Sequence, residues 1–283
     1  MLARYWMHNG MITVNQEKMS KSLNNFFTIR EALVRFHREA IRLFLLSTQY
    51  RNPVDYSDTS LEESEAGLER LYQAVAQAEK FIARDKSPRG IQVRELLEQI
   101  PAERLMKERP WSRLEAPWEV PTARLSLAER ELLELTEQVQ QRLDEAMDDD
   151  FNTARALGHL FELARAIGRF VTVQPKVSAG ATPVLAAAQS VLVGFSRDVL
   201  GLLSVTPAAF QEDLNIRRLQ GRDVTPEAID AQIAERREAR ASKDWARSDR
   251  IRDQLADQGI VLEDSPEGTL WKVTSRIDIA KNS

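Results

Sequence analysis

The chain contains no cysteine, and its longest uncharged stretch, residues 177–196, is interrupted by Gly180, Pro183 and Gln189. Without thiols it can form neither a disulfide nor a thiolate metal site. The uncharged stretch is too weakly apolar for a membrane span. The first residues also lack the basic segment, apolar core and cleavage site of a secretory signal. These absences favour a cytoplasmic protein without a membrane segment.

Aromatic side chains and an excess of one charge are also scarce. Aromatic residues make up 7% of the chain, and 43 acidic against 39 basic residues leave a formal net charge of -4. Such a chain has no global electrostatic field that would attract nucleic acid, so an RNA partner would have to bind at local clusters of basic residues. Its 283 residues are enough for two or three domains, each with its own core.

The strongest functional pattern is the pentapeptide Lys-Met-Ser-Lys-Ser at residues 18–22, which follows the apolar run Met11–Val14 and a polar turn. Its two ammonium groups, set among hydroxyls, suit a loop that grips the oxygens of a phosphate chain. In nucleotidyl transfer such lysines neutralise the charge that grows on the departing pyrophosphate. The pattern therefore predicts ATP chemistry. The alternative is a solvated surface loop, because short clusters of lysine and serine are common.

The residues around the pentapeptide predict that a strand enters the loop and that a helix leaves it. Thr28, with Glu31 three residues later, forms the Thr-x-x-Glu pattern of a helix capping box. A loop between a strand and a helix start is a context in which a phosphate-binding motif gains weight. The flanks therefore favour the phosphate-binding interpretation over the surface loop.

Further segments make the chain resemble the class I aminoacyl-tRNA synthetases, and among them the cysteinyl-tRNA synthetases. They occur in the family's order along nearly the whole chain: residues 5–11 (YWMHNGM), 18–22 (KMSKS), 25–28 (NFFT), 148–153 (DDDFNT), 243–246 (KDWA) and 259–264 (GIVLED). The resemblance implies an enzyme that activates cysteine with ATP, accompanied by Mg²⁺, and transfers it to the cysteine tRNA.

The resemblance also implies roles within the pentapeptide. Lys21, the second lysine of the motif, would contact ATP phosphate directly. Lys18, also assigned a catalytic role, would shape or assist the loop. Met19, Ser20 and Ser22 would complete the ATP-binding loop. Closure of this loop over ATP during adenylate formation would make its mobility part of the mechanism.

The hydrophobic spacing predicts a mainly α-helical chain. One long helix is expected from Thr28 to Tyr50, ending before the breaker pair Asn52-Pro53. A polar stretch without periodicity at residues 211–223 predicts a linker. Further helices are expected over residues 61–81, 91–100, 127–147, 153–170, 183–203, 226–241 and 244–257, and a β-hairpin over 260–263 and 269–273.

These elements and the resemblance together predict three parts. Residues 1–58 would form the edge of a Rossmann-type catalytic domain, with the pentapeptide at residues 18–22, here called the lysine loop, and the helix after it. Residues 59–210 would form a helical bundle, and residues 222–283 a small α/β domain that binds the anticodon. Residues 84–125, with prolines around Trp111 and Trp118, look like an insertion into the bundle. We expect a long loop packed on the bundle there, with a docking surface for protein or RNA as the alternative.

The acidic segment Asp148–Thr153 lies between two expected helices. Asp150 or Asn152 could cap the second of these helices, which is the interpretation we prefer. Three consecutive carboxylates could instead bind a metal, but no complementary set of ligands is evident. The three histidines, His8, His37 and His159, form no spaced metal pair. We expect His37 and His159 to be ordinary helix residues, and we predict no metal ligands in this chain.

A local basic and aromatic cluster surrounds the junction of the last two expected helices. Arg240, Lys243, Trp245 and Arg247 combine phosphate contacts with a stacking face. Single-stranded RNA loops are recognised by stacking and by hydrogen bonds to exposed base edges. The cluster therefore predicts RNA binding, with a solvated pair of charged helices as the alternative.

The resemblance assigns contacts with the cysteine anticodon to Arg240, Trp245, Asp249 and Asp264. A carboxylate can accept a hydrogen bond from the exocyclic amine of cytosine or adenine, which suits the two aspartates. The alternatives are structural. Asp249 could pair with Arg252 or Lys243, and Asp264 could begin a turn.

Three features of a complete class I synthetase are absent from this sequence: the His-x-Gly-His signature, the family's zinc ligands and the amino-acid pocket. Zinc is expected only in the missing N-terminal part. We therefore expect the C-terminal portion of a longer synthetase, beginning just before the lysine signature and unable to activate cysteine alone. One alternative is a stand-alone, noncatalytic RNA-binding module. Another is a cysteine ligase that acts on an amino-sugar acceptor, which would not need the segment 240–264.

Overall fold

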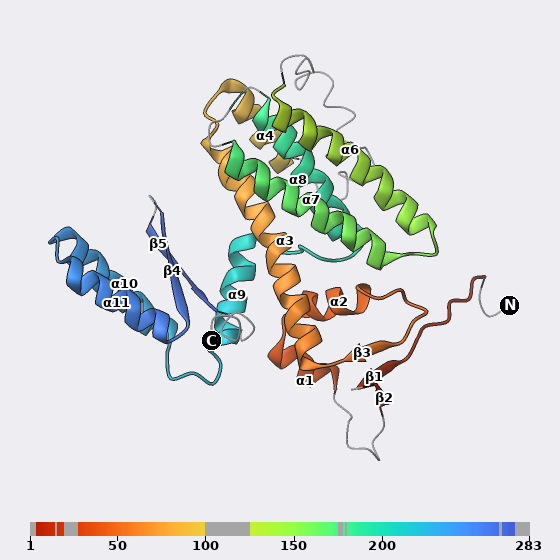
Figure 1. The fold of residues 1–283 in the computed structure, drawn as a ribbon, viewed down its shortest axis with the longest axis horizontal. Coiled ribbons are helices and arrows are strands. Elements are labelled where there is room, and N and C mark those ends of the chain that lie inside the picture. The colour runs from red at the N-terminus through yellow and green to blue at the C-terminus, as the bar shows by residue number, and fades with distance from the viewer. Residues whose placement is uncertain are drawn as a thin grey trace.

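The computed structural model describes residues 4–14, 16–19, 28–99, 125–174, 178, 180–265 and 268–274, and it is mainly helical, as predicted (Figure 1). A small sheet with two short helices, a bundle of longer helices and a helical pair with a hairpin follow one another along the chain. Trp111 and Trp118 of the expected insertion lie outside the described residues. Across the described ranges, no helix has both the length and the apolarity to cross a bilayer.

The N-terminal part is built on three short strands. β1 (Ile12–Val14) lies between β2 (Glu17–Lys18) and β3 (Val54–Tyr56). β1 is antiparallel to β2 and parallel to β3, so Thr13 pairs with Lys18 on one side and Asp55 on the other. The strand expected before the lysine loop is confirmed. β3 escapes the sequence analysis because three residues after a proline are too few to show a period.

The single helix expected over residues 28–50 is two helices, α1 (Ile29–Arg35) and α2 (Arg38–Leu46), separated by two extended residues. Nδ1 of His37 accepts a hydrogen bond from the N–H of Glu39 at 3.2 Å. His37 is therefore the N-cap of α2, and the prediction that it is an ordinary helix residue is wrong. The break also lets the buried Glu39 carboxylate accept hydrogen bonds from the Tyr72 hydroxyl at 2.9 Å and the Leu203 N–H at 2.8 Å.

The predicted bundle helices are present with small changes at their ends. They are α3 (Asp58–Arg84), α4 (Pro88–Gln99), α6 (Leu127–Asp148), α7 (Thr153–Val173) and α8 (Ala181–Asp198). Their apolar faces share one core, and each large side chain buried there contributes roughly 1.5–3 kcal/mol. Side-chain oxygens of Ser57, Ser126 and Asn152 accept hydrogen bonds from first-turn N–H groups of α3, α6 and α7. Asn152 is thus the cap expected between α6 and α7.

Residues 211–223 were expected to form a linker, but most of them belong to helix α9 (Pro207–Leu219). Thr206 caps this helix, and Pro207 occupies its first position, where a missing N–H costs nothing. α9 was not predicted from the sequence, because its apolar residues pack into two different cores. Phe210 and Leu214 pack into the bundle, whereas Leu219 packs into the C-terminal unit. Figure 1 shows α9 between these two parts.

The C-terminal unit has the elements predicted for it. They are α10 (Pro226–Ala241), α11 (Trp245–Asp257), β4 (Ile260–Ser265) and β5 (Gly268–Val273). β4 and β5 pair antiparallel as a hairpin. Gly259, with φ of 75°, ends α11 in a backbone conformation that favours glycine. A small separate core joins the helices to the hairpin through Ile229, Ile251, Leu255, Ile260 and Val273.

Candidate functional site

The strand that leads into the lysine loop is fixed by one carboxylate. Oδ1 of Asp55 accepts hydrogen bonds from the Thr13 hydroxyl and from the N–H of Gln16, both at 2.7 Å. Gln16 has φ of 66°, and this bond holds its turn between β1 and β2. Lys18 follows on β2 with an exposed side chain. Asp55 leaves no local signal in the sequence, because its partners lie about forty residues earlier in the chain.

The far side of the loop is fixed by the predicted capping box. Oγ1 of Thr28 accepts a hydrogen bond from the N–H of Glu31 at 3.2 Å, and the Glu31 carboxylate accepts one from the N–H of Thr28 at 2.6 Å. The hydrogen bonds that the N–H and the hydroxyl of Thr28 donate to the Glu31 carboxylate lower the pKa of Glu31. The capping box is therefore confirmed. Ser20, Lys21 and Ser22 lie outside the described residues, and Met19 is half-buried.

The acidic segment after α6 holds the sheet region against the bundle. The Asp150 carboxylate accepts hydrogen bonds from Arg51, through Nε at 2.5 Å, and from the Tyr50 hydroxyl at 2.8 Å. Nε2 of Gln49 donates to the Asp150 carbonyl at 3.0 Å. The hydrogen bonds from Arg51 and Tyr50 lower the pKa of Asp150 to about 2. Asp150 thus acts as an ion-pair partner, whereas the cap that it could have provided comes from Asn152.

The α10–α11 junction presents the predicted basic and aromatic residues on a tight turn. The N–H of Asp244 donates to the carbonyl of Ala239 at 2.8 Å, and the N–H of Lys243 donates to that of Arg240 at 3.1 Å. This is the Schellman pattern, and Lys243 takes its left-handed position with φ of 60°. Asp244 then caps α11. Trp245, the first residue of α11, is left 59% exposed beside this turn.

Asp264 is the most heavily bonded of the predicted RNA-contacting residues. Its two carboxylate oxygens accept from both terminal nitrogens of Arg236, at 2.8 and 2.9 Å, and from Arg240 at 2.8 Å. The Thr269 hydroxyl donates to Oδ1 at 2.8 Å. The hydrogen bonds from Arg236 and Thr269 hold the pKa of Asp264 well below its usual range. Arg240 and Asp264 are thus in direct contact, and Asp264 lies in strand β4 rather than at the start of a turn.

Arg247 and Asp249 of α11 have different electrostatic partners. Arg247 pairs with Glu235 across the two helices, at 2.7 Å. Asp249 is exposed on α11, and its charge contributes, after that of Asp264, to the raised pKa of Arg236. Within the ranges the structure describes, no ion pair joins Asp249 to Arg252 or Lys243. Arg236, which the sequence analysis missed, therefore lies at the centre of this group.

The remaining histidines are His8 and His159. His8 is exposed, and Nδ1 of His159 lies 3.8 Å from the Glu162 carboxylate one turn later on α7. His159 is an ordinary helix residue, as predicted. Among the described residues, no group of three or more histidine, aspartate or glutamate side chains is arranged to hold a metal ion.

Comparison with protein families gives three matches in sequence order. Residues 1–66 match the model described as the tRNA synthetases class I (C) catalytic domain. Residues 142–204 match the DALR domain, and residues 222–271 match the cysteinyl-tRNA ligase anticodon binding domain. The sheet with the lysine loop, the later bundle helices and the C-terminal unit thus fall in three different family models.

Curated relatives match nearly the whole chain. Proteins named cysteine-tRNA ligase from Geotalea daltonii, Geotalea uraniireducens and Pelobacter propionicus are 42%, 39% and 41% identical to it. Each alignment covers 95% of this chain and 49% of the relative. The chain therefore spans about half the length of the curated relatives it matches.

Proposed function

We propose a function from the premise that this chain belongs to the cysteinyl-tRNA synthetase family, as the C-terminal portion of such a synthetase. The parent reaction is activation of cysteine with ATP and transfer of the cysteinyl group to the cysteine tRNA. This chain supplies the lysine loop and the tRNA-binding surface, and it does not activate cysteine alone. We place the enzyme in the cytoplasm.

The observation that carries the RNA-binding part is the exposed indole of Trp245 beside the strained Lys243 turn. A non-glycine residue in the left-handed region costs free energy, and such strain is common at functional sites. Lys243 and the exposed Trp245 are two residues apart on this turn, and a cation together with an aromatic face is a combination that binds unpaired nucleotides. In this proposal Trp245 stacks on an anticodon base and Lys243 contacts backbone phosphate.

The two aspartates and Arg240 have different parts in this proposal. Asp249 is exposed and, among the described residues, lacks the hydrogen bonds that occupy Asp264, so it accepts a hydrogen bond from the exocyclic amine of an anticodon base. Asp264 orients Arg240, whose guanidinium it contacts at 2.8 Å, toward phosphate or base. Direct contact of Asp264 with a base would require it to exchange one of its present donors.

The ATP part of the proposal concerns charge on the departing pyrophosphate. Lys21 binds ATP phosphate and stabilises charge that is larger in the transition state than in the ground state. Lys18 lies on β2 at the entry to the loop and assists from there. Exposed apolar side chains around this sheet, including Trp6, Met11, Ile29 and Val34, suit packing against the rest of a catalytic domain.

The RNA-binding part can be tested on this chain directly. Titration with cysteine tRNA should give tighter binding than titration with the same tRNA carrying another anticodon, at one stated salt concentration. Trp245→Ala should weaken binding of the cognate tRNA by about 5- to 150-fold, because base stacking contributes roughly 1–3 kcal/mol. Arg130→Ala, at an exposed position of α6, is the control. Equal affinity for both tRNAs would contradict anticodon recognition.

The ATP part needs an enzyme that joins this chain to the catalytic half found in its relatives. Lys21→Ala should slow cysteine-dependent exchange of pyrophosphate into ATP by orders of magnitude and leave the fold intact. Lys80→Ala, on an exposed position of α3, is the matched control. Pyrophosphate exchange at the normal rate in the Lys21 variant would contradict the role of Lys21 in binding ATP phosphate. It would favour the noncatalytic RNA-binding module.

A further inference from the structure

Helix α9 is shared between two cores. Phe210 and Leu214 are fully buried with the bundle helices, and the Phe210 ring stacks on Tyr72 of α3 at 4.0 Å between centroids. Leu219, at the other end, packs with Ile229 of α10 and its neighbours. A helix buried at both ends in different cores is held as a rigid element, because neither end can move without exposing apolar surface.

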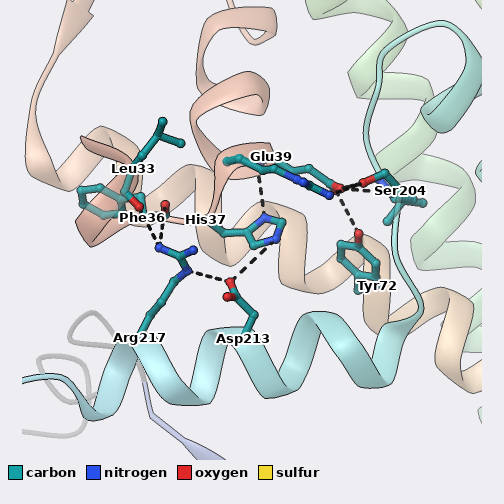
Figure 2. A network of polar contacts seen from close by, with 10 residues as sticks. Leu33, Phe36, His37, Glu39, Tyr72, Ser204, Asp213 and Arg217 are labelled. Atoms are coloured by element: carbon teal, nitrogen blue, oxygen red, sulfur yellow. Dashed lines mark hydrogen bonds and ion pairs between the residues drawn. The ribbon is translucent and has the colours of Figure 1, made fainter. Parts of the chain in front are cut away.

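One side of α9 holds the backbone that follows the lysine loop (Figure 2). Nη1 of Arg217 donates to the carbonyl of Leu33 at 2.8 Å and lies 3.4 Å from that of Phe36. The same guanidinium is oriented by Asp213, which accepts from its Nε at 2.6 Å. Asp213 also lies 3.8 Å from Nε2 of His37. Arg217 therefore binds the carboxyl end of α1, where a cation is favourable.

The same helix holds the C-terminal hairpin. Nδ2 of Asn215 donates to the carbonyl of Trp271 at 3.1 Å, and Oδ1 of Asn215 accepts from the N–H of Val273 at 3.1 Å. Arg218 donates to the carbonyl of Val273 at 2.9 Å and to Glu69 of α3 at 3.0 Å. Residues adjacent in α9 thus bind β5 on one side and the end of α1 on the other.

Helix α1 depends on such support. It has seven residues, about two turns, and an isolated helix of that length does not persist in water. Its N-terminus is capped by Thr28, six residues after the end of the pentapeptide. Its C-terminal end is held by Arg217 and by an ion pair of Arg35 with Asp58 at 2.7 Å. The position of α1 therefore depends on contacts made at its far end.

We propose that Arg217 is a positioning residue that fixes α1, and with it the capped helix start at Thr28, relative to the RNA-binding unit. Arg217 holds the carboxyl end of α1 while Asn215 and Arg218 hold β5, so one helix sets both positions. This inference rests on the proposed function, because it assigns a consequence for tRNA charging. It goes beyond that function in naming the residue that joins the two sites.

The positioning itself can be tested on the chain without any enzyme assay. The amides of Ala32 and Phe36 close the hydrogen bonds of α1, at 3.1 and 2.9 Å. In Arg217→Ala their hydrogen exchange should accelerate about tenfold or more, with amides of α7 unchanged. Arg217→Lys should recover part of the protection, because it keeps a cation and one donor at the helix end. Glu212→Ala, on the exposed side of α9, is the control.

The functional consequence is tested in the enzyme that joins this chain to a catalytic half. Arg217→Ala should lower kcat for tRNA charging about tenfold or more, since misplacement of reacting groups is costly. The KM for cysteine and the Kd for tRNA should stay near those of the parent, and Arg217→Lys should restore part of kcat. Asp213→Asn removes the charge that orients Arg217. Its kcat should lie between those of Arg217→Ala and Arg217→Lys.

The outcomes separate this inference from the proposed function. Unchanged exchange at Ala32 and Phe36 in Arg217→Ala would overturn the positioning role, whatever the enzyme does. Accelerated exchange with unchanged kcat would overturn the link between α1 and tRNA charging. A general fall in melting temperature, with equal loss of tRNA binding and charging, would also overturn it and leave a purely structural role. An unmodified enzyme that never charges tRNA refutes the proposed function, while the exchange result still judges the α1 contact.

Discussion

Arg236 and Asp264 form a two-pronged ion pair between α10 and β4, with nitrogen-to-oxygen distances of 2.8 and 2.9 Å. The Arg236 side chain is 8% exposed, whereas that of Asp264 is 41% exposed. The buried cation thus anchors a carboxylate that faces the same surface as Arg240. The pair connects the stability of the small domain with the surface proposed to bind the anticodon.

Removal of this buried cation should destabilise the C-terminal unit. For Arg236→Ala we expect a loss of about 2 kcal/mol in the free energy of unfolding. Breaking a buried pair costs more than that, but Asp264 is partly solvated and keeps two other donors. Urea unfolding followed by tryptophan fluorescence would measure the change. Arg237→Ala, exposed one residue later, should leave the transition in place. A shift of equal size in both variants would contradict the anchoring role.

The Asp150 contact with Arg51 predicts a specific pH dependence. The folded-state pKa of Asp150 is about 2, below the ordinary value of 3.8. Its stabilising contribution is therefore fully present above pH 3.8 and is lost as pH falls toward 2. Asp150→Asn should melt at a lower temperature than the parent at pH 7. The difference should shrink between pH 4 and pH 2, roughly the interval bounded by the two pKa values. A constant difference down to pH 2 would exclude an ionic origin.

The left-handed conformation of Lys243 predicts a trade between stability and binding. Lys243→Gly should stabilise the chain by about 1 kcal/mol, because glycine adopts this backbone without steric cost. The same variant should bind cysteine tRNA more weakly, since it loses a cation beside Trp245. Thermal melting and tRNA titration on the same preparation would check both effects. If Lys243→Gly gains stability without losing affinity for cysteine tRNA, Lys243 does not contact the RNA.

The buried carboxylate of Glu39 depends on the hydroxyl of Tyr72, which donates to it at 2.9 Å. Figure 2 shows this bond together with Ser204, whose hydroxyl and N–H both reach the same carboxylate. Tyr72→Phe should therefore cost about 1–2 kcal/mol, because a buried acceptor loses one donor while the ring packing is retained. Chemical denaturation would measure it. Tyr50→Phe, at a surface bond to Asp150, should cost less; equal losses would mean that burial does not set the cost.

Local signals allowed much of the fold to be predicted. The capping box of Thr28 and Glu31, the helix begun by Pro226 and the stop at Gly259 each depend on residues a few positions apart. Interactions of that range leave a readable pattern in a single sequence. The hairpin of β4 and β5 was predictable for the same reason.

The errors all lie where distant contacts decide the structure. The helix expected over residues 28–50 breaks at His37, because Glu39 is bound by residues of α3 and of the segment after α8. The expected linker is a helix because its few apolar residues enter two different cores. Neither cause has a period that could be found along the chain.

The candidate sites divide in the same way. The sequence supplied the residue types: lysines and serines for phosphate, and an indole with arginines for RNA. It could not indicate that Asp264 is occupied by Arg236, or that Asp249 carries no such bonds in the described part of the chain. The roles of Lys18, Lys21, Arg240, Trp245, Asp249 and Asp264 in binding stay predictions.

By itself the sequence determined the helical class of this protein, its family and the two segments that we propose to carry its chemistry. These follow from short patterns, because capping, periodicity and motif spelling act over a few residues. Only the tertiary structure decided that Arg217 reaches the carbonyl of Leu33, 184 residues earlier in the chain. Contacts of that separation form when whole helices pack, and packing depends on shapes that no local pattern encodes.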